Sequence, residues 1–119
     1  MTTAPTIWIN AGETSGDLHG QLLVQALREQ CPGASFTGMA GPAMREEGVE
    51  ALLRTEALSV MGFTEVLAQL PKIMGLLRTV KDQLAKTRPD VVVVIDAPDF
   101  HFRVARIAQS LGIPVVYYI

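Results

Sequence analysis

Five consecutive β-branched residues, Val91 to Ile95, constrain the fold of this chain more than any other feature. β-Branched residues favour extended strands, and a strand without a polar face must be covered on both sides. Such strands lie in the interior of parallel sheets, where helices cover both faces. We therefore expect a central parallel strand here, with Asp96 as the first polar residue beyond it.

Shorter strand patterns alternate with helical patterns along the rest of the chain. Strands are predicted at residues 6–10, 35–39, 51–53 and 114–119, and helices at about 14–31, 42–48, 64–88 and 100–112, with residues 58–63 unassigned. Pro71 interrupts the third helical pattern, so we expect a kink or two helices there. Strands that alternate with helices form right-handed βαβ units. The sequence therefore predicts an α/β fold with a mainly parallel sheet and helices on both faces.

Composition restricts the class of protein further. A length of 119 residues fits one domain, and a formal net charge of −2 lacks the basic excess of a nucleic-acid-binding protein. Cys31 is the single cysteine, and no signal-peptide pattern is present, so we expect a reducing, cytoplasmic location. No apolar run approaches the length of a membrane span. The final apolar strand has no polar tail, which indicates that a longer protein continues beyond Ile119.

Two loops are expected at the carboxyl ends of the strands, where open parallel sheets bind ligands. The first, residues 11–20, is rich in glycine and precedes a helix, which Thr14 or Ser15 can cap and whose positive end suits Asp17. Its spacing matches neither the dinucleotide fingerprint nor the Walker loop. This loop either binds an anion or a sugar hydroxyl, or it is simply a tight turn between the strand and the helix.

The second loop begins at Asp96, whose carboxylate would lie at the mouth of the crevice and could accept a proton from a hydroxyl group. The structural alternative is a turn or helix cap, which Asp99 fits better. A serine hydrolase is disfavoured because Ser15 is not in a G-x-S-x-G elbow. No cysteine or histidine pair has metal-ligand spacing, so no metal is predicted. Residues 58–80 mix apolar and basic side chains, which suits a helix covering the sheet, or a segment that lies on an anionic membrane surface or holds an acyl chain.

Four motifs of the chain resemble those of the lipid-A-disaccharide synthases, inverting glycosyltransferases of outer-membrane synthesis in Gram-negative bacteria. The matching stretches are residues 11–17 (AGETSGD), 38–42 (GMAGP), 60–67 (VMGFTEVL) and 89–100 (PDVVVVIDAPDF). They occur in the family's order and spacing and cover nearly the whole chain. The resemblance implies a GT-B architecture of two Rossmann-like domains around a cleft. Residues 1–119 would be part of the N-terminal, acceptor-side domain, and the C-terminal, donor-binding domain would lie beyond them.

The resemblance also implies an activity. Members join UDP-2,3-diacylglucosamine to 2,3-diacylglucosamine 1-phosphate, and the acceptor's 6-hydroxyl displaces UDP to give a β-1,6-linked disaccharide. They need no metal for the chemistry, so no cofactor is expected. They are peripheral proteins on the cytoplasmic face of the inner membrane. Residues 1–119 alone are expected to be inactive, because the donor site would be missing.

Individual positions acquire expected roles from the same resemblance. Asp96 falls on the residue that resembles the family's general base. Residues of the acceptor-side motif are Glu13, Ser15 and Gly16, and those of the region proposed to meet acyl chains or membrane are Met61, Gly62 and Phe63. His101 stands where many members have asparagine.

Two other classes of protein are compatible with acidic strand tips. One is a different GT-B enzyme, such as a UDP-sugar epimerase. The other is a non-catalytic flavodoxin-like or receiver-like binding module, for which Glu13 is only a partial match to the required acidic pair. Only the acyl-sugar transferase predicts dependence on lipid.

Overall fold

The computed structural model describes residues 4–59 and 66–118, and these residues contain a parallel sheet in the strand order β3-β2-β1-β4-β5. All four strand pairings are parallel. The elements in chain order are β1 (Thr6–Ala11), α1 (Thr14–Gln30), β2 (Ser35–Ala40), α2 (Pro42–Glu46), β3 (Glu50–Arg54), α3 (Glu56–Ser59), α4 (Val66–Thr87), β4 (Val91–Ile95), α5 (Pro98–Ser110) and β5 (Val115–Tyr118).

The valine-rich strand β4 lies inside the sheet, between β1 and β5. Its residues 92–95 are all buried, because successive side chains point to opposite faces of a strand and both faces are covered. Val93 pairs with Ile9 of β1 and with Val116 of β5. The predicted α/β fold with its central parallel strand is confirmed.

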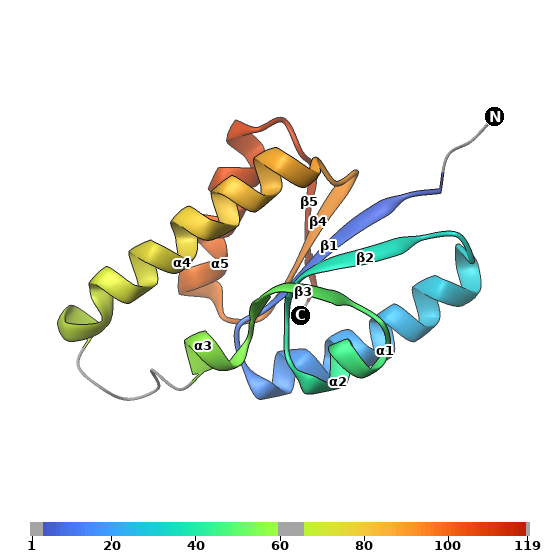
Figure 1. The fold of residues 1–119 in the computed structure, drawn as a ribbon, viewed down its shortest axis with the longest axis horizontal. Helices are drawn as coiled ribbons and strands as arrows, with labels where there is room; N and C mark the ends of the chain where they lie inside the picture. Colours follow the sequence, from blue (N-terminus) through green and yellow to red (C-terminus); the bar gives the residue numbers. More distant parts are fainter. Residues whose placement is uncertain (1–3, 60–65, 119) are drawn as a thin grey trace.

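Each face of the sheet has its own apolar core. On one face, Ile9, Ile95 and Val24 of α1 belong to a cluster that also contains Met44 of α2. On the other face, Trp8, Val92 and Val94 belong to a cluster formed with α4 and α5, whose buried members include Leu77, Val80, Leu84, Phe100, Val104 and Ala108. Figure 1 shows the two helix pairs on opposite sides of the sheet. Alternate residues of β1 and β4 therefore face different cores.

Three local details differ from the sequence-based expectation. No side chain caps α1, whose N-cap residue is Glu13, so the expected cap by Thr14 or Ser15 is wrong. Of the two alternatives expected at Pro71, a division into two helices is wrong, because α4 is one helix with Pro71 inside it; Pro71 is close to the start of α4, where few intrahelical bonds precede it. Helix α5 begins at Pro98, which is a favoured first-turn residue, rather than near Phe100.

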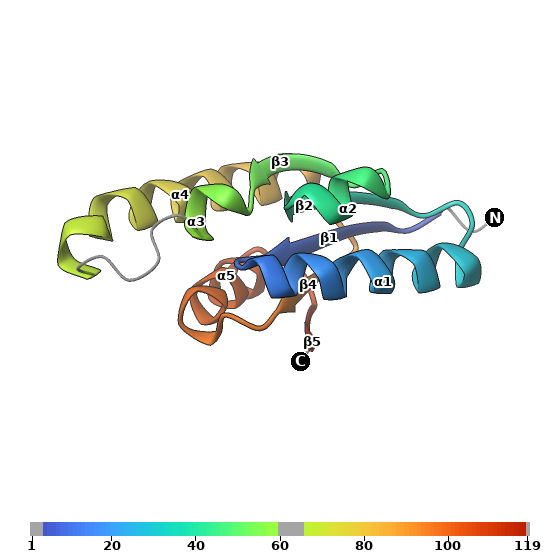
Figure 2. The same ribbon diagram turned by 90° about the horizontal axis from the view of Figure 1, so that it is seen from below.

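The beginning of α4 projects past the sheet. Figures 1 and 2 both show its first turns beyond the strands, and the principal extents of the molecule are 49 × 28 × 21 Å. None of the described helices is long and apolar enough to cross a membrane. Leu70, near the start of α4, lines a groove beside α5, which forms part of the site described below.

Candidate functional site

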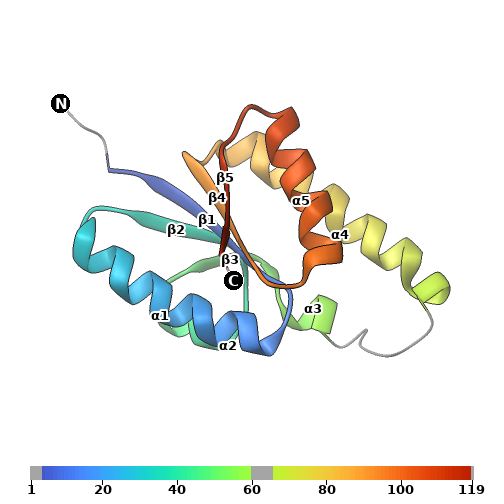
Figure 3. The ribbon, with the colours of Figure 1, turned by 180° about the vertical axis from the view of Figure 1, so that it is seen from behind.

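The loops that follow β1 and β4 meet at the carboxyl end of the sheet, because the two strands are parallel neighbours (Figure 3). Gly12 lies so close to the second loop that an added Cβ would be 3.1 Å from the Cβ of Ala97 and 3.0 Å from Cδ2 of Leu58. Both distances are shorter than ordinary van der Waals contact. The absence of a side chain at Gly12 therefore lets β1, β4 and α3 converge on one place.

Asp96 lies in this place, directly after β4 and at the expected end of the sheet. It is half-buried. Within residues 4–59 and 66–118, its carboxylate has no recorded hydrogen-bond donor or ion pair. The carboxylate is thus available to a ligand that brings its own donor, such as a hydroxyl group.

The backbone around Asp96 is unusual. Asp96 has φ = +50° and Ala97 has φ = +44°, so two consecutive residues other than glycine adopt the left-handed conformation. For such residues this conformation is unfavourable by roughly 1–2 kcal/mol each. The Asp96 carbonyl oxygen accepts hydrogen bonds from Nδ1 of His101 at 2.6 Å and from the Tyr117 hydroxyl at 3.1 Å. Side-chain donors therefore hold the peptide that follows Asp96.

A shallow hollow of about 480 Å³ lies beside Asp96. Its other walls are Pro98, Phe102 and Tyr117, and the rings of Phe102 and Tyr117 are 6.3 Å apart at their centroids, with an interplanar angle of 48°. Phe102 is 62% exposed. The hollow thus combines one carboxylate with an apolar, aromatic wall, which suits the apolar face and hydroxyl groups of a sugar.

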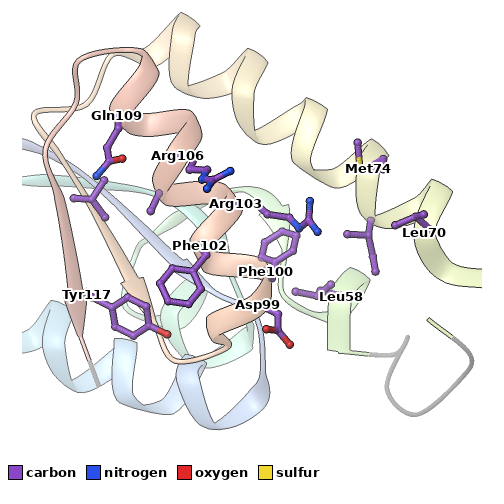
Figure 4. Close-up of a pocket in the computed structure, with 13 residues that line it drawn as sticks. Leu58, Leu70, Met74, Asp99, Phe100, Phe102, Arg103, Arg106, Gln109 and Tyr117 are labelled. Atoms are coloured by element: carbon purple, nitrogen blue, oxygen red, sulfur yellow. The ribbon is translucent and has the colours of Figure 1, made fainter. Parts of the chain in front are cut away.

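A larger groove of about 1010 Å³ extends from between α4 and α5 across to β5, and it shares Phe102 and Tyr117 with the hollow (Figure 4). Its apolar lining includes Leu58, Leu70, Ile73, Met74 and Phe100, and its charged lining includes Arg103 and Arg106. Both arginines are exposed and take part in no ion pair within the described part of the chain. This groove offers an apolar surface next to two positive charges.

Residues of the first loop have different surroundings. Glu13 and Ser15 are exposed at the start of α1, on the loop next to Ala97. Gly16 is buried, and an added Cβ there would touch Ala11 and Ile95 at 3.5–3.6 Å. These are ordinary van der Waals distances, so a methyl group would fit at Gly16, whereas Glu13 and Ser15 are accessible. The substrate-binding roles of all three stay predictions.

Asp17, which was expected to complement the positive end of α1, caps a different helix. Its Oδ1 accepts hydrogen bonds from the backbone N–H groups of Gly41 and Met44, and its Oδ2 accepts one from Ala43, at 2.9–3.0 Å. Asp17 is 2% exposed. Its carboxylate supplies the side-chain acceptor for the free N–H groups at the start of α2, so its role is structural.

An ion pair connects α2 to α3 at the edge of the site. Arg45 of α2 donates to both carboxylate oxygens of Glu56 in α3, at 2.9 and 2.7 Å, and to the carbonyl of Ala40. These charge-assisted hydrogen bonds lower the pKa of Glu56 to about 2. Thr55, just before α3, donates its hydroxyl to the carbonyl of Ala11. Together these contacts hold α3, with its groove residue Leu58, against the end of β1.

The sequence singled out His101 but did not predict the buried hydrogen bonds that it forms beneath Asp96. His101 is fully buried, and besides its bond to Asp96 its Nε2 lies 3.0 Å from Nδ2 of Asn10, whose Oδ1 accepts a hydrogen bond from the Trp8 indole. Burial lowers the pKa of His101. Asn10, a polar residue in an apolar strand, was the available signal, but its partner is 91 positions away.

Three residues expected to meet acyl chains or membrane, Met61, Gly62 and Phe63, lie outside the described residues. The segments on either side of them are described. Leu58 precedes them and Leu70 follows them, and both line the groove.

The sequence is similar to known proteins over nearly its whole length. A family model described as lipid-A-disaccharide synthetase matches residues 7–119. The lipid-A-disaccharide synthase of Myxococcus xanthus is 44% identical over 119 residues, which is 100% of this chain and 31% of that protein. That of Neisseria meningitidis serogroup B is 46% identical over 116 residues, or 98% of this chain and 30% of that protein. The chain thus spans about a third of the length of these curated relatives.

Two solved structures share the fold. The C-terminal domain of a hydrogenase from Pyrococcus furiosus superposes with a TM-score of 0.71 at 14% identity, covering 99% of this chain and 94% of that chain. The glycotransferase of kitacinnamycin superposes with a TM-score of 0.65 at 24% identity, covering 98% and 30%. At these identities the likeness concerns the fold alone.

Proposed function

Because this chain belongs to the lipid-A-disaccharide synthetase family, we propose that the protein containing it joins two acylated glucosamines, with UDP-2,3-diacylglucosamine as donor and 2,3-diacylglucosamine 1-phosphate as acceptor. The observation that carries the proposal is the Asp96 carboxylate, which has no donor within the described residues and lines a hollow at the carboxyl end of the sheet. The product would be a β-1,6-linked disaccharide 1-phosphate.

In this mechanism Asp96 is the general base. The acceptor's 6-hydroxyl would donate its hydrogen bond to the carboxylate and transfer its proton there as the hydroxyl oxygen attacks the anomeric carbon of the donor. The bond from that carbon to UDP breaks, and UDP leaves with the electron pair. A positioned base of this kind contributes about 10²–10⁴-fold to the rate.

The neighbouring features suit an acylated acceptor. The sugar would lie against the Phe102 and Tyr117 rings, and an acyl chain would continue into the apolar groove between α4 and α5, which shares these two rings with the hollow. Arg103 and Arg106 would face the acceptor phosphate or anionic lipid headgroups. Glu13 and Ser15 would contact the acceptor from the first loop, and Met61, Gly62 and Phe63 would extend the apolar surface.

We place these residues in the N-terminal, acceptor-side domain of a GT-B enzyme on the cytoplasmic face of the inner membrane. The donor's UDP group would bind to residues outside 1–119. Isothermal titration of the 119-residue chain with UDP should therefore show no tight site, with circular dichroism to verify that the chain is folded. A strong UDP site on the folded chain would contradict this division.

The decisive test is Asp96→Asn in the full-length protein that contains this chain. Turnover should fall at least 100-fold while the fold and the KM for the acceptor change little, because asparagine preserves size and tolerates the left-handed backbone. The matched control is Asp90→Asn, at the opposite end of β4, where the carboxylate accepts hydrogen bonds from the backbone N–H and hydroxyl of Thr6. Near-normal turnover by Asp96→Asn would remove the carboxylate from the mechanism.

A further inference from the structure

A buried chain of hydrogen bonds leads from the core beneath β1 to the backbone of Asp96. The Trp8 indole N–H donates to Oδ1 of Asn10 at 2.9 Å, Nδ2 of Asn10 lies 3.0 Å from Nε2 of His101, and Nδ1 of His101 lies 2.6 Å from the Asp96 carbonyl oxygen. Trp8, Asn10 and His101 are each 0% exposed. Burying polar atoms is costly unless they are paired, and these hydrogen bonds pair the side-chain nitrogens and oxygens of all three residues.

The direction of every bond in the chain follows from its two ends. The indole N–H can only donate, so the Asn10 oxygen faces Trp8 and its amide nitrogen faces His101. That amide nitrogen can only donate, so Nε2 of His101 accepts and carries no proton. The Asp96 carbonyl can only accept, so Nδ1 of His101 carries the proton. His101 is therefore a neutral imidazole with its proton fixed on Nδ1.

Protonation of His101 would break this arrangement. A second proton, on Nε2, would face the Asn10 amide N–H, and Met39, the other neighbour of that amide, is uncharged. The Asp96 carboxylate is the charge that acts on the ring within the described residues, and it favours the cation, but burial outweighs it and lowers the pKa of His101. The neutral ring is thus consistent with both the hydrogen-bond geometry and the burial of the side chain.

The carbonyl that receives the His101 proton belongs to the peptide between Asp96 and Ala97, the two residues in the left-handed conformation. Rotation of this peptide would move the Asp96 carboxylate relative to the hollow. We infer that His101, oriented by Asn10 and Trp8, is a positioning residue for Asp96, because its Nδ1–H fixes the strained peptide that aims the carboxylate. This inference rests on the proposed function of Asp96.

The state of the ring is tested without any turnover. Long-range ¹H–¹⁵N correlation spectra of the protein at pH 7 should show His101 as the neutral Nδ1–H tautomer. Asn10→Asp places a carboxylate oxygen opposite Nε2 and should convert His101 to the doubly protonated cation. A wild-type His101 that carries its proton on Nε2, or is already a cation, would overturn the bond directions given above.

The positioning role is tested with two amide replacements in the full-length protein. Asparagine carries its amide nitrogen at the δ position, like Nδ1, whereas glutamine carries it at the ε position, like Nε2. His101→Gln should lower kcat by about 10- to 100-fold with little change in KM, as expected when a reacting group is misplaced. His101→Asn should retain kcat within about threefold, although the smaller side chain lowers the melting temperature.

Equal kcat values for the two variants would overturn the positioning role, whether both are active or both inactive, because only one of them restores the δ donor. This result is distinguishable from failure of the proposed function. If Asp96→Asn retains turnover, the mechanism fails while the tautomer of His101 can still be as described.

Discussion

Asp17 and Asp96 both lie near the carboxyl end of the sheet, but their carboxylates have opposite surroundings. That of Asp17 is buried and accepts three backbone N–H hydrogen bonds at the start of α2. That of Asp96 is half-buried, lines a hollow and has no donor within the described residues, while its backbone is held in a strained conformation by two side chains. The Asp17 carboxylate therefore stabilises the fold, whereas the Asp96 carboxylate is available to a ligand.

The contrast teaches how to separate a structural from a chemical aspartate. A carboxylate that is buried and accepts three hydrogen bonds from the protein, like that of Asp17, is out of reach of a substrate, whereas strain next to an accessible carboxylate without donors is typical of functional sites. The sequence placed Asp96 directly after a buried strand and Asp17 in the first turn of a helix, but it did not show which hydrogen-bond donors surround either carboxylate. Their different partners set them apart.

The largest expected effect on stability is that of asparagine at position 17, and the same substitution at position 96 is its comparison. Asp17→Asn should lower the free energy of unfolding by about 2–3 kcal/mol, because the new amide N–H₂ opposes a backbone N–H that loses its acceptor. Asp96→Asn should change it by less than about 0.5 kcal/mol, since the protein loses no hydrogen bond there. Urea unfolding followed by circular dichroism measures both. Equal losses would mean that the two carboxylates do not differ as described.

The next effect concerns the contact between the two loops. Gly12→Ala should destabilise the protein by about 1–2 kcal/mol, because the new Cβ would press on Ala97 and Leu58 at 3.0–3.1 Å. Gly75→Ala in α4 is the control, since an added Cβ there meets nothing within 4 Å, and alanine should stabilise the helix by about 0.5–1 kcal/mol. Thermal unfolding should therefore move in opposite directions. If both variants are stabilised, the loops are not in close contact.

A smaller effect tests the strain beside Asp96. Ala97 has φ = +44°, which glycine adopts without steric cost, so Ala97→Gly should raise the free energy of unfolding by roughly 0.5 kcal/mol after the greater entropy of the unfolded chain is counted. If strain aims the carboxylate, kcat of the full-length variant should fall while stability rises. A variant that gains both stability and turnover would contradict a functional role for this strain.

The parallel sheet could be predicted from the sequence, but the hydrogen-bond partners of the buried polar residues could not. Val91 to Ile95 had no polar face, and that alone required a central strand covered on both sides. Parallel strands then required the loops after β1 and β4 to meet at one edge. The partners of Asp17 lie 24–27 positions away and that of Asn10 lies 91 positions away. Such hydrogen bonds depend on how the helices pack against the sheet, and local sequence patterns do not determine that packing.

The smallest effect belongs to Glu56, a third carboxylate at the same edge, which is paired like Asp17 but 43% exposed in its side chain. The Arg45 hydrogen bonds lower the pKa of Glu56 from its ordinary 4.5 to about 2. A depressed carboxyl pKa stabilises the fold fully above pH 4.5, and the stabilisation is lost as the pH falls toward 2. Because both partners are partly exposed, solvent screening should limit it to about 0.2–0.4 kcal/mol.

Unfolding of wild type and Glu56→Gln should therefore differ at pH 7 and converge between pH 4.5 and 2. The control is Glu46→Gln, at an exposed residue of α2 that forms no ion pair within the described residues, and it should show no such convergence. A difference for Glu56→Gln that grows as the pH falls would have the wrong sign for an ion pair. A difference as large as that of Asp17→Asn would mean that pairing alone, without burial, decides the structural worth of a carboxylate in this fold.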